Sequence, residues 1–166
     1  MFNGFGQATQ QNKAKNNTAA IMTLLLLSGC KGSIECNTTS APALNGNAGC
    51  LSVQDGKILL VKQRSGKYSI PGGTQSGDES AQCTAMRETA EETGLTLAVG
   101  ELLTQFDNGF YLFQCTATDD TAPFANDLLE VSKVMWLDID EVPSEKWRYQ
   151  AQWPIIETLA RKLDRP

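Results

Sequence analysis

The 166-residue sequence contains no histidine. This absence excludes Ser-His-Asp triads, histidine-ligated zinc sites and imidazole acid–base catalysis. The sequence also lacks any Cys-x-x-Cys spacing, so its cysteines do not indicate a zinc ribbon or a thioredoxin-like redox site. Any catalysis must therefore use carboxylates, lysine, tyrosine, cysteine or a metal-bound water.

Positive charge is scarce as well. Fourteen lysines and arginines face 19 acidic residues, which gives a formal net charge of -5, and no basic run interrupts this balance. Such a surface repels the phosphate backbone, so we expect no nucleic-acid partner. Long apolar runs are missing too, because the longest, residues 19–27, is shorter than the roughly 20 residues of a transmembrane helix.

The N-terminal segment has the pattern of a secretory signal peptide. Lys13 and Lys15 precede the apolar run, and Ser28 and Gly29 follow it, which predicts a signal peptide over residues 1–29. Residues 30–49 are rich in Gly, Ser, Thr, Asn and Ala and are interpreted as a flexible tether.

Leu27-Ser28-Gly29-Cys30 resembles the lipobox of bacterial lipoproteins. The resemblance implies cleavage before Cys30, lipidation of that residue and a membrane-anchored protein of the cell envelope that faces the periplasm. Lys31 follows in place of Asp, which implies sorting to the outer membrane if the organism is Gram-negative. The alternative is an unlipidated N-terminus that serves as an inner-membrane anchor.

The stretch from Gly72 to Leu95, GGTQSGDESAQCTAMRETAEETGL, combines a Gly-rich turn with an acidic helix. The helix is expected to begin at Glu79, with Asp78 or Ser76 as its N-cap, and to stop at Gly94. Its composition is that of a loop that delivers carboxylates onto a helix.

Helical spacing brings three carboxylates of this stretch together. Glu88 and Glu92 lie one turn apart with Glu91 beside them, and Arg87 is placed to pair with Glu91. Crowded carboxylates are destabilising unless a cation offsets them, and oxygen ligands suit Mg²⁺ or Mn²⁺. The opposite face is expected to pack on the core through three residues, namely Cys83, Met86 and Ala90.

At these positions the sequence resembles the signature of the Nudix hydrolases, the MutT-like family. The matching residues are Gly73, Glu79 and the run 87–95, which reads RETAEETGL. Thr89 stands where the family usually has an aliphatic residue, and its methyl group can still pack. The resemblance implies that Glu91 and Glu92 bind metal.

Other roles at the site also come from this resemblance. Glu88 is expected to be a metal ligand or the general base, Arg87 to orient the glutamates, and the Gly72 carbonyl to complete the coordination. Glu79 is expected to support the start of the helix or an outer-shell water. Outside the signature, Glu130 and Asp138 or Asp140 are candidates for further acids of the site, although solvated loop charges are the favoured interpretation.

The rest of the chain predicts an α/β domain over residues 50–166. Strands are expected at 50–54, 57–63, 95–106, 110–116 and 131–137, with hairpin turns at Asp55-Gly56 and at residues 107–109. An amphipathic helix is expected over residues 152–163. This mixture predicts a three-layer α/β/α sandwich with a mixed β-sheet, which is also the Nudix fold.

The sequence indicates substrate contacts less clearly than it indicates the metal ligands. Arg64 and Lys67, on the loop before the signature, are candidates for phosphate contacts, although exposed loop cations are equally expected there. Tyr111 is a candidate for base stacking by resemblance to dinucleoside polyphosphate hydrolases, against ordinary packing on a strand. The tryptophans are expected to pack structurally.

With Cys30 acylated, four cysteines remain, and an oxidising compartment allows three pairings of Cys36, Cys50, Cys83 and Cys115. Cys50 and Cys115 lie on expected strands and are the first pair to consider.

The function that follows is Mg²⁺-dependent hydrolysis of a phosphoanhydride in a nucleoside diphosphate linked to a group X, or in a related small-molecule diphosphate. The alternative is a non-catalytic Nudix-like module that binds a nucleotide or a partner. The sequence does not indicate an oligomeric state.

Overall fold

The computed structural model describes Met1, Cys36 and residues 44–118 and 121–165. The expected signal peptide, lipidation site and most of the expected tether lie outside these residues. Residues 34–166 form one compact unit that contains every described strand and helix, both hydrophobic clusters and both disulfides described below. Among the described residues, no helix is long and apolar enough to cross a membrane.

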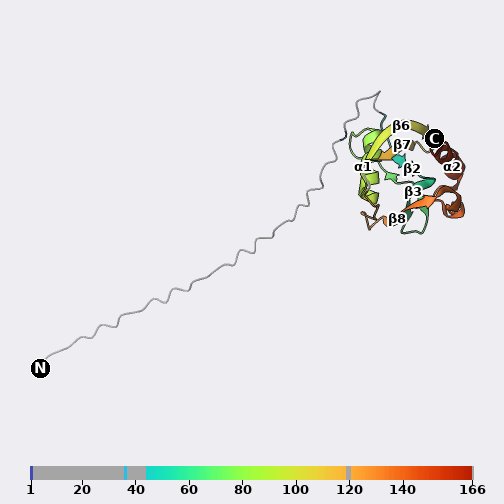
Figure 1. Cartoon of the computed structure of the whole chain (residues 1–166). Coiled ribbons are helices and arrows are strands. Elements are labelled where there is room, and N and C mark those ends of the chain that lie inside the picture. The colour runs from blue at the N-terminus through green and yellow to red at the C-terminus, as the bar shows by residue number, and fades with distance from the viewer. Residues whose placement is uncertain (2–35, 37–43, 119–120, 166) are drawn as a thin grey trace. The chain divides into compact units, whose positions relative to one another are not determined.

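The domain has the expected α/β arrangement, with strands between two helices (Figure 1). One sheet has the order β5-β1-β7-β6, and its members are β1 (Ala48–Leu51), β5 (Gly72–Gly73), β6 (Leu97–Gln105) and β7 (Tyr111–Ala117). β1 and β7 are parallel and the other pairs are antiparallel, so the sheet is mixed.

The second sheet is antiparallel and is centred on β3. It contains β2 (Val53–Gln54), β3 (Lys57–Gln63), β4 (Tyr68–Ser69) and β8 (Val131–Asp138). The chain passes from the first sheet to the second at Ser52, whose carbonyl accepts a hydrogen bond from Leu59 N. The expected turn at Asp55-Gly56 is present, because both residues have positive φ, 50° and 76°.

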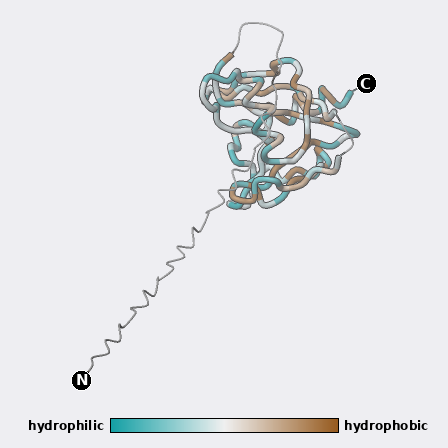
Figure 2. Tube along the Cα trace, turned by 90° about the vertical axis from the view of Figure 1, so that its left-hand side faces the viewer, coloured by the Kyte–Doolittle hydropathy of each residue, from teal (hydrophilic) through white to brown (hydrophobic). Residues whose placement is uncertain are grey.

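Alternation along β3 explains the layers. Leu59 and Val61 belong to a cluster with Ala81 and Ala85 of α1 (Ala81–Thr93), whereas Ile58 and Leu60 point into the other cluster. That second cluster includes Ile156 of α2 (Trp153–Leu163). The two helices therefore cover opposite faces, and hydrophobic stretches cross the middle of the domain (Figure 2).

Short 3-10 turns connect β8 to α2. They span Ile139–Glu141, Ser144–Lys146 and Gln150–Gln152. The expected core role of two tryptophans is confirmed, because Trp147 and Trp153 are 2% and 8% exposed and their ring centroids lie 4.9 Å apart.

The fold begins slightly before the expected boundary at residue 50. β1 starts at Ala48, and the carbonyl of Leu44 accepts a hydrogen bond of 2.6 Å from Ala81 N at the start of α1. The segment just before β1 is therefore part of the packing that positions α1.

Candidate active site

The site is built where β5 delivers the chain into α1. β5 pairs with β1 in the register Ala48↔Gly73 and Gly49↔Gly72. Gly72 has φ of 148°, and a Cβ there would lie 2.6 Å from the carbonyl of Ala48. A Cβ at Gly73 would lie 2.5 Å from the carboxyl carbon of Glu88. Both glycines are needed so that backbone and carboxylate can approach this closely.

α1 starts later than expected, and the expected N-caps are wrong. Ser80 is the N-cap, and its Oγ accepts a hydrogen bond of 3.3 Å from Cys83 N. Asp78 and Ser76 lie in the turn before this cap. In that turn Ser76 N donates a hydrogen bond of 2.7 Å to the Glu79 carboxylate. The expected stop at Gly94 is confirmed, since it has φ of 70° and donates to Ala90 O.

Arg87 is the centre of an ion network. Its guanidinium contacts Glu79 at 2.6 Å, Glu88 at 2.9 Å and Glu91 at 3.1 Å, so the expected Arg87–Glu91 pair is confirmed. It also donates to the carbonyl of Thr74 at 2.9 Å. The hydrogen bond from Arg87 lowers the pKa of Glu79 despite its burial. Glu79 thus holds Arg87 in place through an ion pair that the helical spacing did not predict.

Glu92 is the buried carboxylate of the site. It is 5% exposed, and its Oε2 accepts a hydrogen bond of 2.8 Å from Gly72 N. Burial raises its pKa from 4.5 to about 8, against the lowering effect of the Gly72 hydrogen bond. Burial likewise raises the pKa of Glu88, which Arg87 partly opposes.

Glu130 acts on both of these carboxylates. Its negative charge raises the pKa of Glu88 and of Glu92, although it lies outside the signature and is itself exposed. It adjoins β8, where its carbonyl accepts a hydrogen bond of 3.1 Å from Arg64 N. The interpretation of Glu130 as a solvated loop charge therefore missed its electrostatic coupling to the site.

The expected core-facing stripe of α1 is wrong. Cys83, Met86 and Ala90 are only partly buried, whereas the fully buried face centres on Ala81, Ala85, Thr89 and Glu92. The helix packs on β1 and β5 with the same face that carries Glu88 and Glu92, because Glu92 accepts a hydrogen bond from Gly72 N and Glu88 lies close to Gly73. The site is thus set into the domain and does not lie on a solvent-facing stripe.

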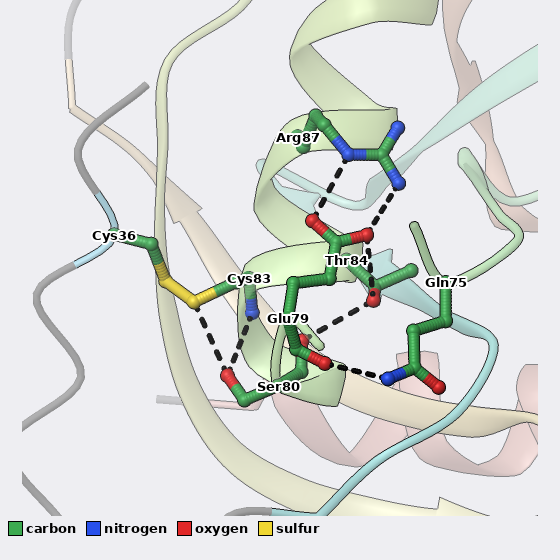
Figure 3. The surroundings of a disulfide bond; sticks show 7 residues. All are labelled: Cys36, Gln75, Glu79, Ser80, Cys83, Thr84 and Arg87. Carbon is green, nitrogen blue, oxygen red and sulfur yellow. Dashed lines mark hydrogen bonds and ion pairs between the residues drawn. A yellow bond between two sulfur atoms is a disulfide. The ribbon is translucent and has the colours of Figure 1, made fainter. Parts of the chain in front are cut away.

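Two disulfides join described residues. The predicted pair Cys50–Cys115 is confirmed, with a Cα–Cα distance of 5.3 Å between β1 and β7. The second joins Cys36 to Cys83, with a Cα–Cα distance of 5.5 Å. Figure 3 shows this bond at the first turn of α1, beside the Ser80 cap and the Glu79–Arg87 pair.

The described residues contain no ready-made group of three or more acidic or cysteine side chains that could hold a metal ion. Arg87 draws Glu88 and Glu91 to itself, and Gly72 holds Glu92. The donor set nevertheless fits a hard divalent cation, since its ligands are all oxygen and the mutual repulsion of Glu88 and Glu92 would be offset by positive charge.

A cavity of about 120 Å³ adjoins this centre. Gly72 and Gly73 form part of its wall, and Phe110, Arg148 and Tyr149 line it elsewhere. The guanidinium of Arg148 lies 5.2 Å from the ring centroid of Tyr149, and its charge lowers the pKa of Glu92. Arg148 therefore links the cavity electrostatically to the carboxylates.

The three expected substrate residues lie outside the lining of this cavity. Arg64 is exposed and donates to the carbonyl of Leu128 at 3.0 Å, and Lys67 is exposed. Tyr111 is partly buried against the α1-side cluster. Sequence reasoning missed Arg148 and Tyr149, for which the only cue was a cation between two aromatic residues in a loop.

Comparison with known proteins agrees with this geometry. A curated MutT-like protein of Streptomyces ambofaciens is 30% identical over 101 residues, which cover 57% of this chain and 64% of the relative. The match thus spans less than two thirds of that relative.

Solved structures share the fold. A NUDIX hydrolase from Nitrosomonas europaea superposes with a TM-score of 0.61 at 21% identity, covering 76% of each chain. An ADP-ribose pyrophosphatase from Streptococcus suis gives 0.59 at 22% identity, covering 73% of this chain and 93% of that one. A UDP-X diphosphatase gives 0.58 at 23% identity, covering 77% and 66%.

The family model of the NUDIX domain matches residues 44–159, a stretch that contains the Gly-rich turn, the acidic helix and the cavity. Because this match covers well over half of the chain, the protein belongs to the Nudix hydrolase family.

Proposed function

We propose that the protein hydrolyses a phosphoanhydride bond in a nucleoside diphosphate linked to a group X, or in a related diphosphate, with Mg²⁺ or Mn²⁺ as cofactor. The observation that carries this proposal is the buried pairing of Glu92 with the Gly72 backbone beside Glu88 and the Arg87 network. Structural neighbours named as an ADP-ribose pyrophosphatase and a UDP-X diphosphatase support the substrate class.

The proposed metal ligands are Glu88, Glu91 and Glu92, with the Gly72 carbonyl as a further candidate. A bound divalent cation would neutralise the diphosphate and acidify a water. Glu88 and Glu130 are the candidates for the base that takes a proton from the attacking water, because the negative charge of each acts on the Glu92 carboxylate. The water oxygen bonds to phosphorus, the bridging P–O bond breaks, and two phosphate products leave.

Arg87 has a positioning role in this proposal. Its guanidinium contacts Glu79, Glu88 and Glu91 at once, so it fixes the rotamers of the acids and limits their repulsion. Glu79 in turn fixes Arg87, and its low pKa keeps it charged at neutral pH. The network therefore holds the carboxylates in place before substrate arrives.

The cavity beside Gly72 and Gly73 is proposed to hold the group X or the nucleoside. Tyr149 and Phe110 offer aromatic surfaces for stacking, and Arg148 offers a cation for a phosphate or ribose oxygen. Arg148→Ala is expected to raise KM with a smaller effect on kcat, because this residue lines the proposed substrate cavity and forms no ion pair with the proposed metal ligands.

An exported, envelope-anchored location is part of the proposal. Disulfides persist in oxidising compartments, so the Cys36–Cys83 and Cys50–Cys115 bonds support export. Lipidation of Cys30 is proposed from the lipobox resemblance alone. Metabolic labelling with a fatty acid tests it, because only an acylated Cys30 incorporates label and Cys30→Ser would abolish it.

The decisive experiment measures phosphate or nucleotide release by residues 34–166 with Mg²⁺ across nucleoside diphosphate-X, nucleotide and lipid diphosphate compounds. Glu92→Gln should reduce turnover more than about a hundredfold, since even outer-shell changes at metal sites cost about 10–100-fold. The matched control Glu101→Gln, at an exposed position of β6, should retain activity. A folded, Mg²⁺-binding protein with no turnover on any compound would favour the non-catalytic nucleotide-binding module.

A further inference from the structure

One corner of the domain carries lysines that the strand register forces together. Lys62 of β3 and Lys133 of β8 are directly opposite in the antiparallel pairing (the two strands are neighbours in Figure 1). Like charges at such positions are destabilising. Within the described part of the chain, the salt bridges use Arg87 and Arg161 as cations, so neither lysine of this pair forms an ion pair with a described acidic side chain.

Two more cations extend this corner through the turn between β3 and β4. Lys67 follows the turn, and its carbonyl accepts a hydrogen bond of 2.8 Å from Gln63 N at the end of β3. Arg64 reaches across to the segment before β8, where its Nη1 donates to Leu128 O at 3.0 Å. We define the basic corner by these four cations, Lys62, Arg64, Lys67 and Lys133.

Two leucines project beside the basic corner. Leu128 and Leu129 are 65% and 86% exposed, on a turn that Arg64 contacts. The turn is fixed because Asp127 Oδ1 accepts hydrogen bonds from Leu129 N at 2.9 Å and Glu130 N at 3.4 Å. The nearby carboxylate of Asp127 is thus engaged with backbone amides. Adjacent exposed leucines on a fixed turn favour an apolar environment outside the domain.

We propose that the basic corner and the Leu128–Leu129 turn dock the domain onto a lipid bilayer that contains anionic headgroups. The leucines would enter the interfacial region, and the four cations would lie at the level of the headgroups. Charge complementarity favours this face, because four cations gather here beside one exposed acid, Glu130, whereas the chain as a whole carries a net charge of -5.

A bilayer fits this surface better than a protein partner does. Three of the four cations are lysines, and lysine is depleted in protein–protein interfaces, whereas lysines beside exposed apolar residues are typical of interfacial membrane contact. The Lys62 ammonium lies 5.6 Å from the ring centroid of Tyr68. A flexible lysine side chain can extend from this ring to a lipid headgroup. The proposal is independent of hydrolysis and does not require lipidation.

The test uses residues 34–166, which lack the N-terminal apolar run, and measures cosedimentation with vesicles. Vesicles of phosphatidylcholine alone are compared with vesicles that also contain phosphatidylglycerol, at low and high salt. We expect binding only to the anionic vesicles, weakened by salt because three of the four cations are exposed and Lys62 is partly exposed. Leu128→Ser/Leu129→Ser and Lys62→Gln/Lys133→Gln should each lower the partition coefficient by about tenfold or more.

Matched controls lie on and after α2. Lys162→Gln/Arg165→Gln removes two exposed cations elsewhere, and Ile155→Ser removes an exposed apolar side chain that is 45% exposed. Each should change the partition coefficient by less than about twofold. Circular dichroism should show that all variants fold, and vesicle binding should be unchanged by Glu92→Gln, which separates this test from that of hydrolysis.

Three results would overturn the proposal. The first is equal binding to both kinds of vesicle, and the second is a loss in the control pair as large as that in the corner variants. The third is self-association in sedimentation equilibrium that Leu128→Ser/Leu129→Ser abolishes without any vesicle binding, which would assign the surface to a second copy of the chain.

Discussion

α1 and α2 cover opposite faces of the same strands, yet they are held there by different means. α2 buries Trp153, Ile156 and Ala160, an ordinary apolar stripe. α1 buries Glu92 together with three threonines, and only two alanines, Ala81 and Ala85, provide apolar contact. Hydrophobic burial therefore accounts for the docking of α2 and only for part of that of α1.

Specific contacts take the place of apolar burial at α1. The Ser80 cap, the Gly94 stop, the Gly72–Glu92 hydrogen bond and the Cys36–Cys83 bond all act on this one helix. A buried carboxylate and buried hydroxyls cost stability in the absence of such partners. The comparison teaches that the helix with the proposed metal ligands is stabilised less by apolar packing than the closing helix is.

The strongest way to test this comparison is the pH dependence of stability without metal. Glu92 has a folded-state pKa of about 8 against 4.5 ordinarily, so between these values the folded state keeps a proton that the unfolded chain has lost. Stability therefore falls as pH rises through this window, by an upper limit of about 5 kcal/mol from this group. The raised pKa of Glu88 acts in the same direction.

Glu92→Gln should remove most of that slope. Urea unfolding in a chelator is expected to show the variant equal to wild type near pH 5 and up to about 4 kcal/mol more stable at pH 8. The lowered pKa of Glu79 makes stability depend on pH only in the acidic range, because its stabilisation is present at neutral pH and is lost as pH falls through its folded-state pKa. Parallel curves for the two proteins would show that Glu92 is not desolvated as described.

A substitution that creates a cavity beneath α2 tests the same comparison at the other helix. Ile156 is 1% exposed within the apolar cluster, so Ile156→Ala should lower the free energy of unfolding by about 2–5 kcal/mol. Turnover at a temperature where the variant is folded should be unchanged, since α2 contributes no proposed catalytic group. The control Ile155→Ala, at a 45% exposed position, should change stability by about 0.5 kcal/mol or less. A large loss of kcat would mean that the two helices are not independent.

The smallest expected effect concerns the one position that departs from the family signature. Thr89 is fully buried, and its Oγ1 has no hydrogen-bond partner among the described residues. Thr89→Val should stabilise the protein by about 1 kcal/mol in thermal or urea unfolding without changing kcat, because it removes an unsatisfied hydroxyl.

Thr93 is the matched control for that substitution. Its hydroxyl donates to Thr89 O at 2.6 Å and accepts from Leu95 N at 3.2 Å, so Thr93→Val should destabilise by about 1–3 kcal/mol. Two variants with the same change in chemistry are thus expected to shift stability in opposite directions. Destabilisation by both would mean that the Thr89 hydroxyl is satisfied in solution.

The same contrast explains what the sequence could predict. α2 follows from its apolar periodicity, the Asp55-Gly56 turn from its dipeptide, and the Arg87–Glu91 pair from i,i+4 spacing. The core face of α1 was assigned to the wrong side because its buried positions are polar, which a hydrophobicity pattern reads as solvent-facing.

Features that depend on chain segments meeting in space could not be read from spacing. Ser80 became the N-cap because the turn before it folds Glu79 towards Arg87. Cys36 and Cys83 are 47 positions apart, and the cavity unites β5 with residues that precede β1, lie between β6 and β7, and follow β8. Such contacts are fixed by tertiary packing, which local propensity does not encode.

The Cys36–Cys83 bond also sets a distance. If Cys30 carries lipid as proposed, the covalent path from the membrane to the domain through this bond contains only six residues, whereas the path along the chain to Leu44, whose carbonyl is hydrogen-bonded to α1, contains fourteen. At about 3.5 Å per extended residue, the reach is about 20 Å with the bond and about 50 Å without it. With that anchor, the disulfide would act as a short tether on α1, and its reduction would more than double the height to which the candidate site could rise above the bilayer.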